Sequence, residues 1–288
     1  MKNLFYVFLT ASAVSIINIS NAEQFAQNTN FIDDVKKIVH TKLPDRSEIE
    51  KFILHNKTYG LPVNLTKKFG KNFKNINFSK IYAREVSITD ANMQDAMFEF
   101  ANFEKAYIIN SDLSNSKMMA VDFSNSTIID SKLVGVNLNL ATLDNAILHG
   151  NNFENANFEG ANLSYANLSN TNLRNANLNN VDLSWANLQG ADLTGAKLNN
   201  VKLSYANLMN TTLDKATFKN SSLQEAVLIN ASLKDTSFEN SDLRRADLRW
   251  TKLSKAKLIN VDLARARTNP LKYETEEFQS SVDSMTQK

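Results

Sequence analysis

The strongest constraint on this chain is an apolar residue that recurs at every fifth position. The series runs from Ile88 to Leu263 and comprises 36 consecutive pentapeptides without an insertion. A five-residue period would distribute these side chains around the whole surface of an α-helix, so no helical face could be buried. The period therefore indicates a repeated extended structure. Phe73 and Phe78 lie in the same register, which predicts a degraded start of the pattern before Ile88.

The other positions of each unit are equally regular. Two residues before each apolar position stands Ala, Ser, Thr or Val in 35 of the 36 units, and Asn151 is the exception. This alternation places the small and the large residue inward and the residue between them outward, as in a short β-strand. The last two positions are rich in Asn, Gly, Asp and Ser, which are typical of turns because Asn and Gly tolerate positive φ.

Two units show the pattern in full, Ala161-Asn162-Leu163-Ser164-Tyr165 and Ala191-Asp192-Leu193-Thr194-Gly195. They resemble the A(D/N)LxX motif of the pentapeptide-repeat family. The resemblance implies the family's all-β solenoid, a right-handed quadrilateral parallel β-helix with four pentapeptides in each coil. The 36 units then form about nine coils at a spacing of about 4.8 Å. We predict this β-helix over residues 73–267, with an interior column that contains Phe98, Phe158, Phe218 and Phe238.

The N-terminus reads as a secretory signal. Lys2 precedes an uncharged, mostly apolar run over residues 4–19, and Ser20-Asn21-Ala22 supplies small residues for cleavage. Residues 1–22 are therefore predicted to be a signal peptide cleaved near Ala22, and the protein to be exported to the periplasm or the extracellular space. The chain contains no cysteine, which excludes a lipoprotein anchor, disulfides and thiolate metal sites.

Residues 23–72 are predicted to form a helical N-terminal cap, because a solenoid needs its terminal coils covered. Helical spacing of apolar residues occurs over residues 31–39 and again over residues 49–53, with Ser47 and Glu50 in a capping-box pattern. A separate binding role for this segment is the alternative. Residues 268–288 are predicted to be a polar tail, since Thr268 breaks the repeat and Pro270 follows. The family resemblance implies a homodimer through the C-terminal coil.

Chemistry-bearing residues are scattered. His40, His55 and His149 have no spacing typical of a metal site or a catalytic triad, and glycine-rich phosphate loops are absent from the sequence. The frequent outward aspartates are interpreted as turn-supporting and solubilising residues. We therefore expect no catalytic residue, no metal site and no cofactor, and we predict that the protein is not an enzyme.

Residues twenty apart should stack in one column on the surface. Tyr165, Trp185 and Tyr205 form such a column, which continues to Glu225, Arg245 and Arg265. The rings either stabilise adjacent coils or bind a sugar or a protein partner. The candidate binding residues are Tyr165, Trp185, Tyr205 and Arg245. A second column is predicted to be an amide ladder: Asn180, Asn200, Asn220, Asn240 and Asn260.

Charge is divided along the repeat. Residues 86–165 carry a formal balance of −7 and residues 166–267 one of +5. The first function hypothesis is an exported, non-enzymatic binding or scaffolding protein whose partner is a protein or an envelope component. The second comes from the resemblance, because some pentapeptide-repeat proteins mimic duplex DNA and bind a topoisomerase. That role requires a rod that is acidic throughout and that stays in the cytoplasm. Here the second half of the rod is basic and the signal peptide directs export, so DNA mimicry is not favoured and a nucleic-acid partner is not expected. The third is carbohydrate binding by the aromatic column.

Overall fold

The computed structural model describes residues 6–10, 13–17 and 43–269. The chain divides into two units, residues 1–43 and 44–288, which are described separately. In the first unit, β1 (Tyr6–Thr10) and β2 (Ala13–Ile17) form an antiparallel pair within the predicted signal peptide. The first predicted cap helix, over residues 31–39, and residues 270–288 of the tail predicted over residues 268–288 lie outside the described residues.

The second unit begins with two helices, α2 (Arg46–Thr58) and α3 (Leu65–Phe69). Helix α2 confirms the second predicted cap helix, but the predicted capping box was wrong by two residues. Asp45 is the N-cap, and its carboxylate accepts a hydrogen bond from the Ser47 amide while Glu48 reaches back to the Asp45 amide. Asp45 occupies the N-cap because Pro44 fixes an extended entry directly before it, and Ser47 already lies inside the helix.

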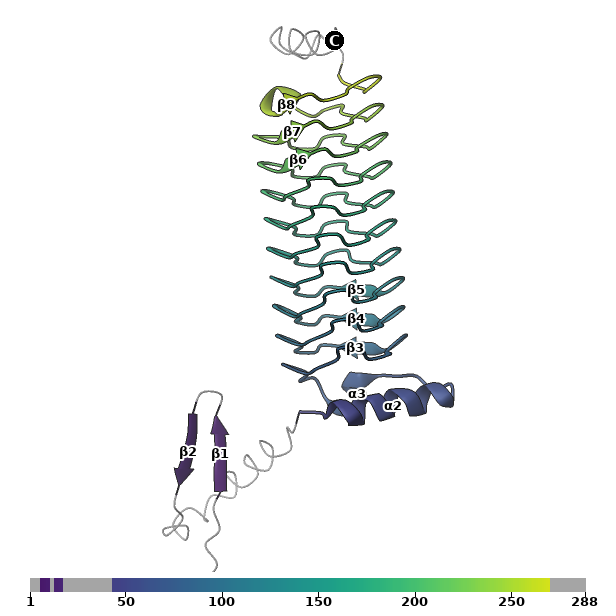
Figure 1. Cartoon of the computed structure of the whole chain (residues 1–288), viewed down its shortest axis with the longest axis vertical. Helices are drawn as coiled ribbons and strands as arrows, with labels where there is room; N and C mark the ends of the chain where they lie inside the picture. The colour runs from purple at the N-terminus through teal and green to yellow at the C-terminus, as the bar shows by residue number, and fades with distance from the viewer. Residues whose placement is uncertain (1–5, 11–12, 18–42, 270–288) are drawn as a thin grey trace, which may run out of the picture. The chain divides into compact units, whose positions relative to one another are not determined.

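The two helices close the N-terminal end of the β-helix (Figure 1). Ile49, Ile53 and Leu65 are buried and belong to the same hydrophobic core as the first coils. The segment between the helices is fixed by the backbone, since the Ser87 amide donates to the Val63 carbonyl at 2.8 Å. The first coil therefore does not expose its apolar interior to water, which is the purpose of a solenoid cap.

From residue 71 to residue 267 the chain forms nine complete stacked coils and most of a tenth (Figure 1). In nearly every unit the residue before the inward one pairs in parallel with the residue twenty positions later, beginning with Asn72 and Asn92. The expected β-helix and its start before Ile88 are confirmed. Three strands form one parallel sheet: β3 (Ser87–Thr89), β4 (Tyr107–Ile109) and β5 (Thr127–Ile129). Three more form a second parallel sheet: β6 (Thr217–Lys219), β7 (Ser237–Glu239) and β8 (Lys257–Ile259).

Four pentapeptides make one coil, so the β-helix has four walls. We number them by the inward residue of the first coil: wall 1 begins at Phe73, wall 2 at Phe78, wall 3 at Ala83 and wall 4 at Ile88. Wall 4 contains β3, β4 and β5, and wall 2 contains β6, β7 and β8. The short 3-10 helix η2 (Leu253–Lys255) replaces the regular turn of wall 1 in the last coils.

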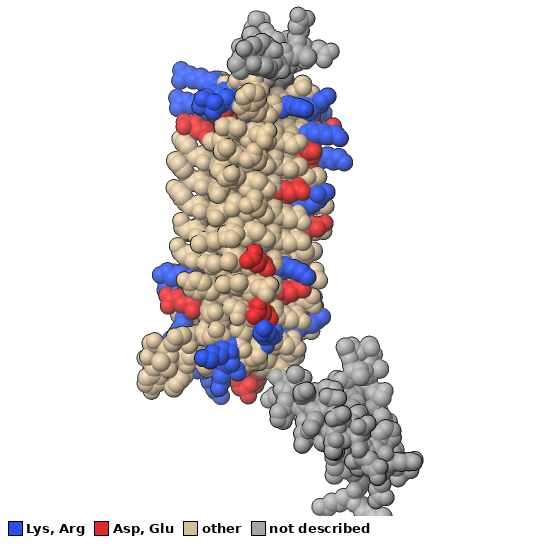
Figure 2. All heavy atoms as spheres, turned by 180° about the vertical axis from the view of Figure 1, so that it is seen from behind, with Lys and Arg blue, Asp and Glu red and all other residues tan. Residues whose placement is uncertain are grey.

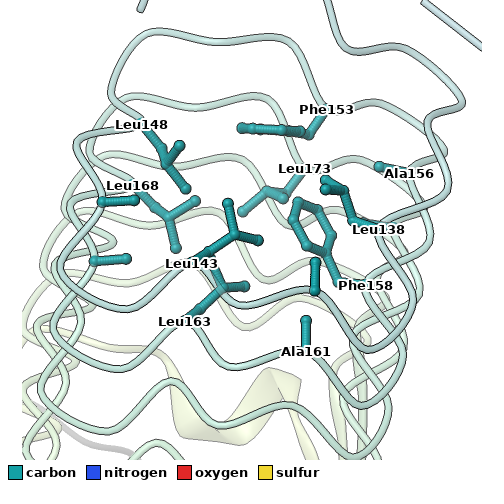
Figure 3. Packing of buried hydrophobic residues seen from close by; sticks show 14 of the residues in the cluster. Leu138, Leu143, Leu148, Phe153, Ala156, Phe158, Ala161, Leu163, Leu168 and Leu173 are labelled. Carbon is teal, nitrogen blue, oxygen red and sulfur yellow. The ribbon is translucent and has the colours of Figure 1, made fainter. Parts of the chain in front are cut away.

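Side chains fill the interior of the coils (Figure 3). The Phe column predicted for wall 2 is present but mixed with other residues. Phe218 stacks on Phe238 with ring centroids 4.6 Å apart, and Phe98 stacks on Phe78 at 5.0 Å. Phe158 lies in the same column between Leu138 and Leu178. Because these rings are fully buried and in contact, the coil is a packed core.

The turns explain the composition of the repeat. In nearly every unit the residue two positions after the inward residue has positive φ, such as Asn175 at 56° and Asn180 at 61°. Where Asn or Asp stands one residue before the inward position, its side chain commonly accepts a hydrogen bond from the backbone amide two residues on, as Asp182 does from Ser184 at 3.0 Å. The motif's Asp or Asn is therefore a turn-forming residue, as predicted.

Asn151 is the one residue that breaks the small-residue rule, and its amide is fully bonded in the core. Its Nδ2 donates to the Ile128 and Leu148 carbonyls at 2.6 and 2.9 Å, and its Oδ1 accepts from the Ser131 amide at 2.8 Å. Ser131 in turn accepts from the Ser111 amide at 3.1 Å. These side chains form a ladder along the corner after wall 4 and satisfy amides that would otherwise be buried without a partner.

The substitution Asn151→Ala should therefore destabilise the β-helix by roughly 1–3 kcal/mol, because it leaves buried donors and acceptors unpaired. Urea unfolding followed by circular dichroism measures the loss. The matched control is Asn139→Ala on the outer side of wall 2, where the same chemical change should cost less than about 0.5 kcal/mol. Equal losses in the two variants would contradict this role for Asn151.

Candidate functional site

The aromatic column lies on the corner between walls 3 and 4. Tyr165, Trp185 and Tyr205 each occupy the positive-φ position of their turn, with φ of 60°, 63° and 62°. Most corner positions of the chain carry Asn or Gly, for which this conformation costs least. Three bulky rings at successive turns are locally unfavourable, so another interaction must offset their backbone conformation.

That interaction is ring stacking. The rings of Tyr165 and Trp185 have centroids 6.1 Å apart at an interplanar angle of 5°, and those of Trp185 and Tyr205 are 4.3 Å apart at 11°. The structure thus brings together the three rings that the twenty-residue spacing predicted. All three remain exposed, at 59%, 52% and 43% of their surface for Tyr165, Trp185 and Tyr205.

The stacking geometry limits what the column can bind. A sugar packs on the open face of an aromatic ring, and the Trp185 ring has a tyrosine ring on each side. The column therefore presents to a partner only the edges of the three rings and the outer faces of Tyr165 and Tyr205. This geometry suits a contact along the edge of the column better than the enclosure of a single sugar ring.

Arg245 lies in the same corner column but does not contact the rings. Its Nη1 pairs with Glu225 Oε1 at 3.0 Å, and Glu225 stands one coil beyond Tyr205. The four candidate residues therefore form two groups, a stack of three rings and an ion pair next to it. An exposed pair of this kind contributes about 0–1 kcal/mol to stability.

The predicted amide ladder is present on the corner after wall 2, but it is interrupted between Asn220 and Asn240, which are not joined by a hydrogen bond. The Asn200 amide donates to Asn180 at 3.1 Å, Asn220 donates to Asn200 at 3.4 Å, and Asn260 donates to Asn240 at 3.1 Å. A second ladder of the same kind runs up wall 4 through Asn167, Asn187 and Asn207. These side chains bond to one another along the rod, as in stacked β-structures.

One group of exposed residues was missed by the sequence reasoning. Tyr107 and Ile147 on wall 4 expose 53% and 42% of their surface, and the outward Ile109 and Ile129 beside them are half-buried. Their signal was present in the sequence, but it appears only when each outward position is followed in steps of twenty. This cluster lies on the outside of the first coils.

Four arginines of the last coils, Arg244, Arg245, Arg249 and Arg267, are paired with carboxylates. Arg249 and Arg267 both bind Asp247, at 2.7 and 3.3 Å. Hydrogen bonds from Arg249 lower the pKa of the Asp247 carboxyl, although its burial acts in the opposite direction. Arg244 has the same effect on the pKa of Asp242. Figure 2 shows Lys and Arg side chains gathered at the C-terminal end of the β-helix.

Within the described residues, no group of three or more His, Asp or Glu side chains is placed to hold a metal ion. Among those same residues, no helix is long and apolar enough to span a membrane. His55 lies in α2 and His149 on the outer side of wall 4, far apart in the sequence and in different elements. His40 lies outside the described residues.

The repeat also decides the family. The family model for pentapeptide repeats matches residues 87–267 in successive, overlapping copies. The chain belongs to the pentapeptide-repeat family. No curated protein matches its sequence.

Solved pentapeptide-repeat structures share the fold. A trypsin-treated form of QnrB1, a plasmid-mediated fluoroquinolone resistance protein, has a TM-score of 0.56 at 16% identity, covering 69% of this chain and 96% of that one. A second such QnrB1 structure has a TM-score of 0.53 at 13% identity, covering 76% and 96%. HetL from the cyanobacterium Nostoc, involved in regulating heterocyst differentiation, is 27% identical over 78% of this chain and 94% of its own, with a TM-score of 0.33.

The stacked rings of this pentapeptide-repeat protein should be energetically coupled. In a double-mutant cycle of Trp185→Asn and Tyr205→Asn, the coupling energy should be about 0.5–1.5 kcal/mol, because these rings are stacked 4.3 Å apart. Asn is the replacement because it tolerates positive φ. Urea unfolding measures all four variants of the cycle.

The control cycle combines Tyr165→Asn with Tyr205→Asn. These rings are two coils apart and are separated by Trp185, so their effects should add to within about 0.5 kcal/mol. A coupling in the control as large as in the adjacent pair would show that the rings act on coil stability by some route other than stacking.

Proposed function

We propose that this chain is an exported, non-enzymatic pentapeptide-repeat protein that binds or scaffolds other molecules through the flat walls of its β-helix. The packed interior supports this proposal most directly. Phe98, Phe158 and Phe218 are at most 1% exposed, so the coils offer no room for a substrate between them. A rigid surface with regular steps of about 4.8 Å is suited to recognising an extended or repetitive partner.

Export is supported by the N-terminal sequence. Lys2, the apolar run over residues 4–19 and Ser20-Asn21-Ala22 form the three parts of a signal peptide. Its removal near Ala22 leaves the helical cap and the β-helix as the mature protein. The proposed partner is then a protein or another component of the cell envelope or the medium.

DNA mimicry is the less favoured candidate. The likeness to QnrB1 is at 13–16% identity and concerns the fold alone. A DNA mimic requires negative charge along the whole rod, and residues 166–267 carry a formal balance of +5. Carbohydrate binding by the aromatic column is not favoured either, because the rings cover one another's faces.

Export is tested by expressing the full chain in a Gram-negative cell and fractionating it. We expect the protein in the periplasm or the medium, with an N-terminus at Glu23 by mass spectrometry. The variant Ala22→Arg should retain the signal peptide, because a large charged residue blocks the cleavage position. A full-length chain that stays in the cytoplasm would contradict export and would return DNA mimicry to first place.

Binding is tested with a photo-crosslinking amino acid on each wall. Asn152, Asn157, Asn162 and Asn167 occupy the same outward position on walls 1 to 4 of one coil, so they form a matched set. We expect one wall, or two adjacent walls, to cross-link a defined partner in the native envelope or medium. Identical patterns from all four walls, or none from any wall, would contradict a binding role for the walls.

A further inference from the structure

Wall 4 differs from the other three walls in its lack of charge. Its sixteen outward positions from Ser87 to Ile229 contain no Lys, Arg, Asp or Glu. The matching coils of walls 1, 2 and 3 carry seven, five and six charged residues in their outward positions. Charged side chains normally cover the surface of a soluble protein. Because eight coils of wall 4 have no charged side chain in their outward positions, burying this wall costs less desolvation free energy than burying any of the other three.

Apolar residues on this wall form two groups separated by the Asn167–Asn187–Asn207 ladder. The first group is the cluster already described, near the N-terminal end. The second, nearer the C-terminal end, is half-buried within the chain and consists of Met209, Val227 and Ile229. An apolar group at each end, with an uncharged polar centre, is the pattern expected of a surface that pairs with itself in reverse.

We propose that wall 4 is the interface of a homodimer in which two copies pack antiparallel, related by a two-fold axis at the coil of Tyr165 and Asn170. In this register each coil faces the coil equally far from the centre in the second copy. Tyr107 then faces Val227, Ile109 faces Ile229, and Ile129 faces Met209. Three of the four residues of the first apolar group are thus covered by the second apolar group of the partner, and the fourth, Ile147, faces Asn187 of the amide ladder.

The corner column between walls 3 and 4 fixes the register. In the proposed dimer, Glu85 of one copy faces Arg245 of the other, and Lys105 faces Glu225. A shift by one coil in one direction would place Lys105 opposite Arg245 and Glu85 opposite Arg265, so one like pair would stand beside one opposite pair. A shift in the other direction would place Glu85 opposite Glu225 and leave Lys105 without an opposite charge. Only the proposed register has two opposite-charge pairs and no like pair in this column, so electrostatics favour it.

The same column is complementary in shape. Trp185 and Tyr205 of one copy face the smaller Asn145 and Asn125 of the other, and Tyr165 faces its own copy across the axis. The exposed edges of the stacked rings therefore meet shorter side chains. The ring edges, which stacking leaves exposed, therefore contact the second copy along the border of the dimer interface.

Charge along the rod favours the antiparallel over the parallel arrangement. Antiparallel packing sets the half with a balance of −7 beside the half with +5, whereas parallel packing would join like halves.

The size of the proposed interface is also adequate for a stable dimer. The fourteen outward positions from Tyr107 to Ile229, which face one another in this register, and the two flanking corner columns supply roughly 20–30 residues per side, as in a standard interface. Ser87 and Thr89 lie at its ends and face Asp247 and Arg249.

Sedimentation velocity of the purified exported chain, over about 1 to 100 µM, tests the proposal. We expect a dimer that Asn167→Lys weakens roughly tenfold or more, because it places two like charges at the two-fold axis. The matched control is Asn137→Lys, since Asn137 begins an equivalent amide ladder on wall 2. Lys117, Lys132, Lys197 and Lys202 already occupy this outward position elsewhere, so both variants should fold.

A wild-type chain that is monomeric throughout this range would overturn the proposal. So would a dimer that survives Asn167→Lys unchanged, which is the result expected of pairing through the C-terminal coil. Equal weakening by Asn167→Lys and Asn137→Lys would also overturn it, because it would show no preference for wall 4.

The register is tested by cross-linking, which is clean because the chain has no cysteine. Mixed Ile109→Cys and Ile229→Cys chains should be joined by a maleimide cross-linker of about 10 Å, the usual separation of packed sheets. The control mixture of Ile109→Cys with Ile129→Cys chains places the thiols of any two paired copies at least four coils further apart along the rod, so it should cross-link much less. Equal yields from the two mixtures would refute the antiparallel register.

Discussion

The backbone hydrogen bonds between successive coils are the interaction on which the whole molecule depends. Within one pentapeptide, the Leu183 amide donates to the Lys202 carbonyl of the next coil at 2.7 Å, and the Asp182 amide donates to the Ala161 carbonyl of the previous coil at 3.1 Å. These bonds require corresponding residues to be twenty apart. A single inserted residue would displace every inward side chain that follows it, which is why the repeat keeps one register over 36 units.

This constraint makes most of the fold predictable from the sequence. Small and large inward residues, the turn-forming Asn or Asp and the positive-φ position all have a fixed place in a unit, so the β-helix, the Phe column and the amide ladder followed from counting. The aromatic column followed in the same way. Its ring geometry did not, because the spacing of 4.3 and 6.1 Å between centroids depends on side-chain rotamers that a period does not specify.

The features that were harder to predict involve breaks in the repeat. Asn151 is an exception by residue type, but its three hydrogen bonds make it part of the corner ladder begun by Ser111 and Ser131. The cap has no repeat to fix its register, and there Pro44 moved the helix start to Asp45. Wall 4 was overlooked for a different reason. Its lack of charge is spread over eight coils, so no local segment of the sequence appears unusual.

The turns have a consequence for the lifetime of the protein. Between residues 71 and 267, nearly every corner is a tight turn whose backbone amide donates a hydrogen bond to the next coil, and the described coils contain no inserted loop. Proteases cut most readily at mobile loop tips that can leave the folded body and enter their active sites. A rod built only from such corners offers few sites of this kind, so its survival among proteases depends chiefly on how firmly its two ends are closed.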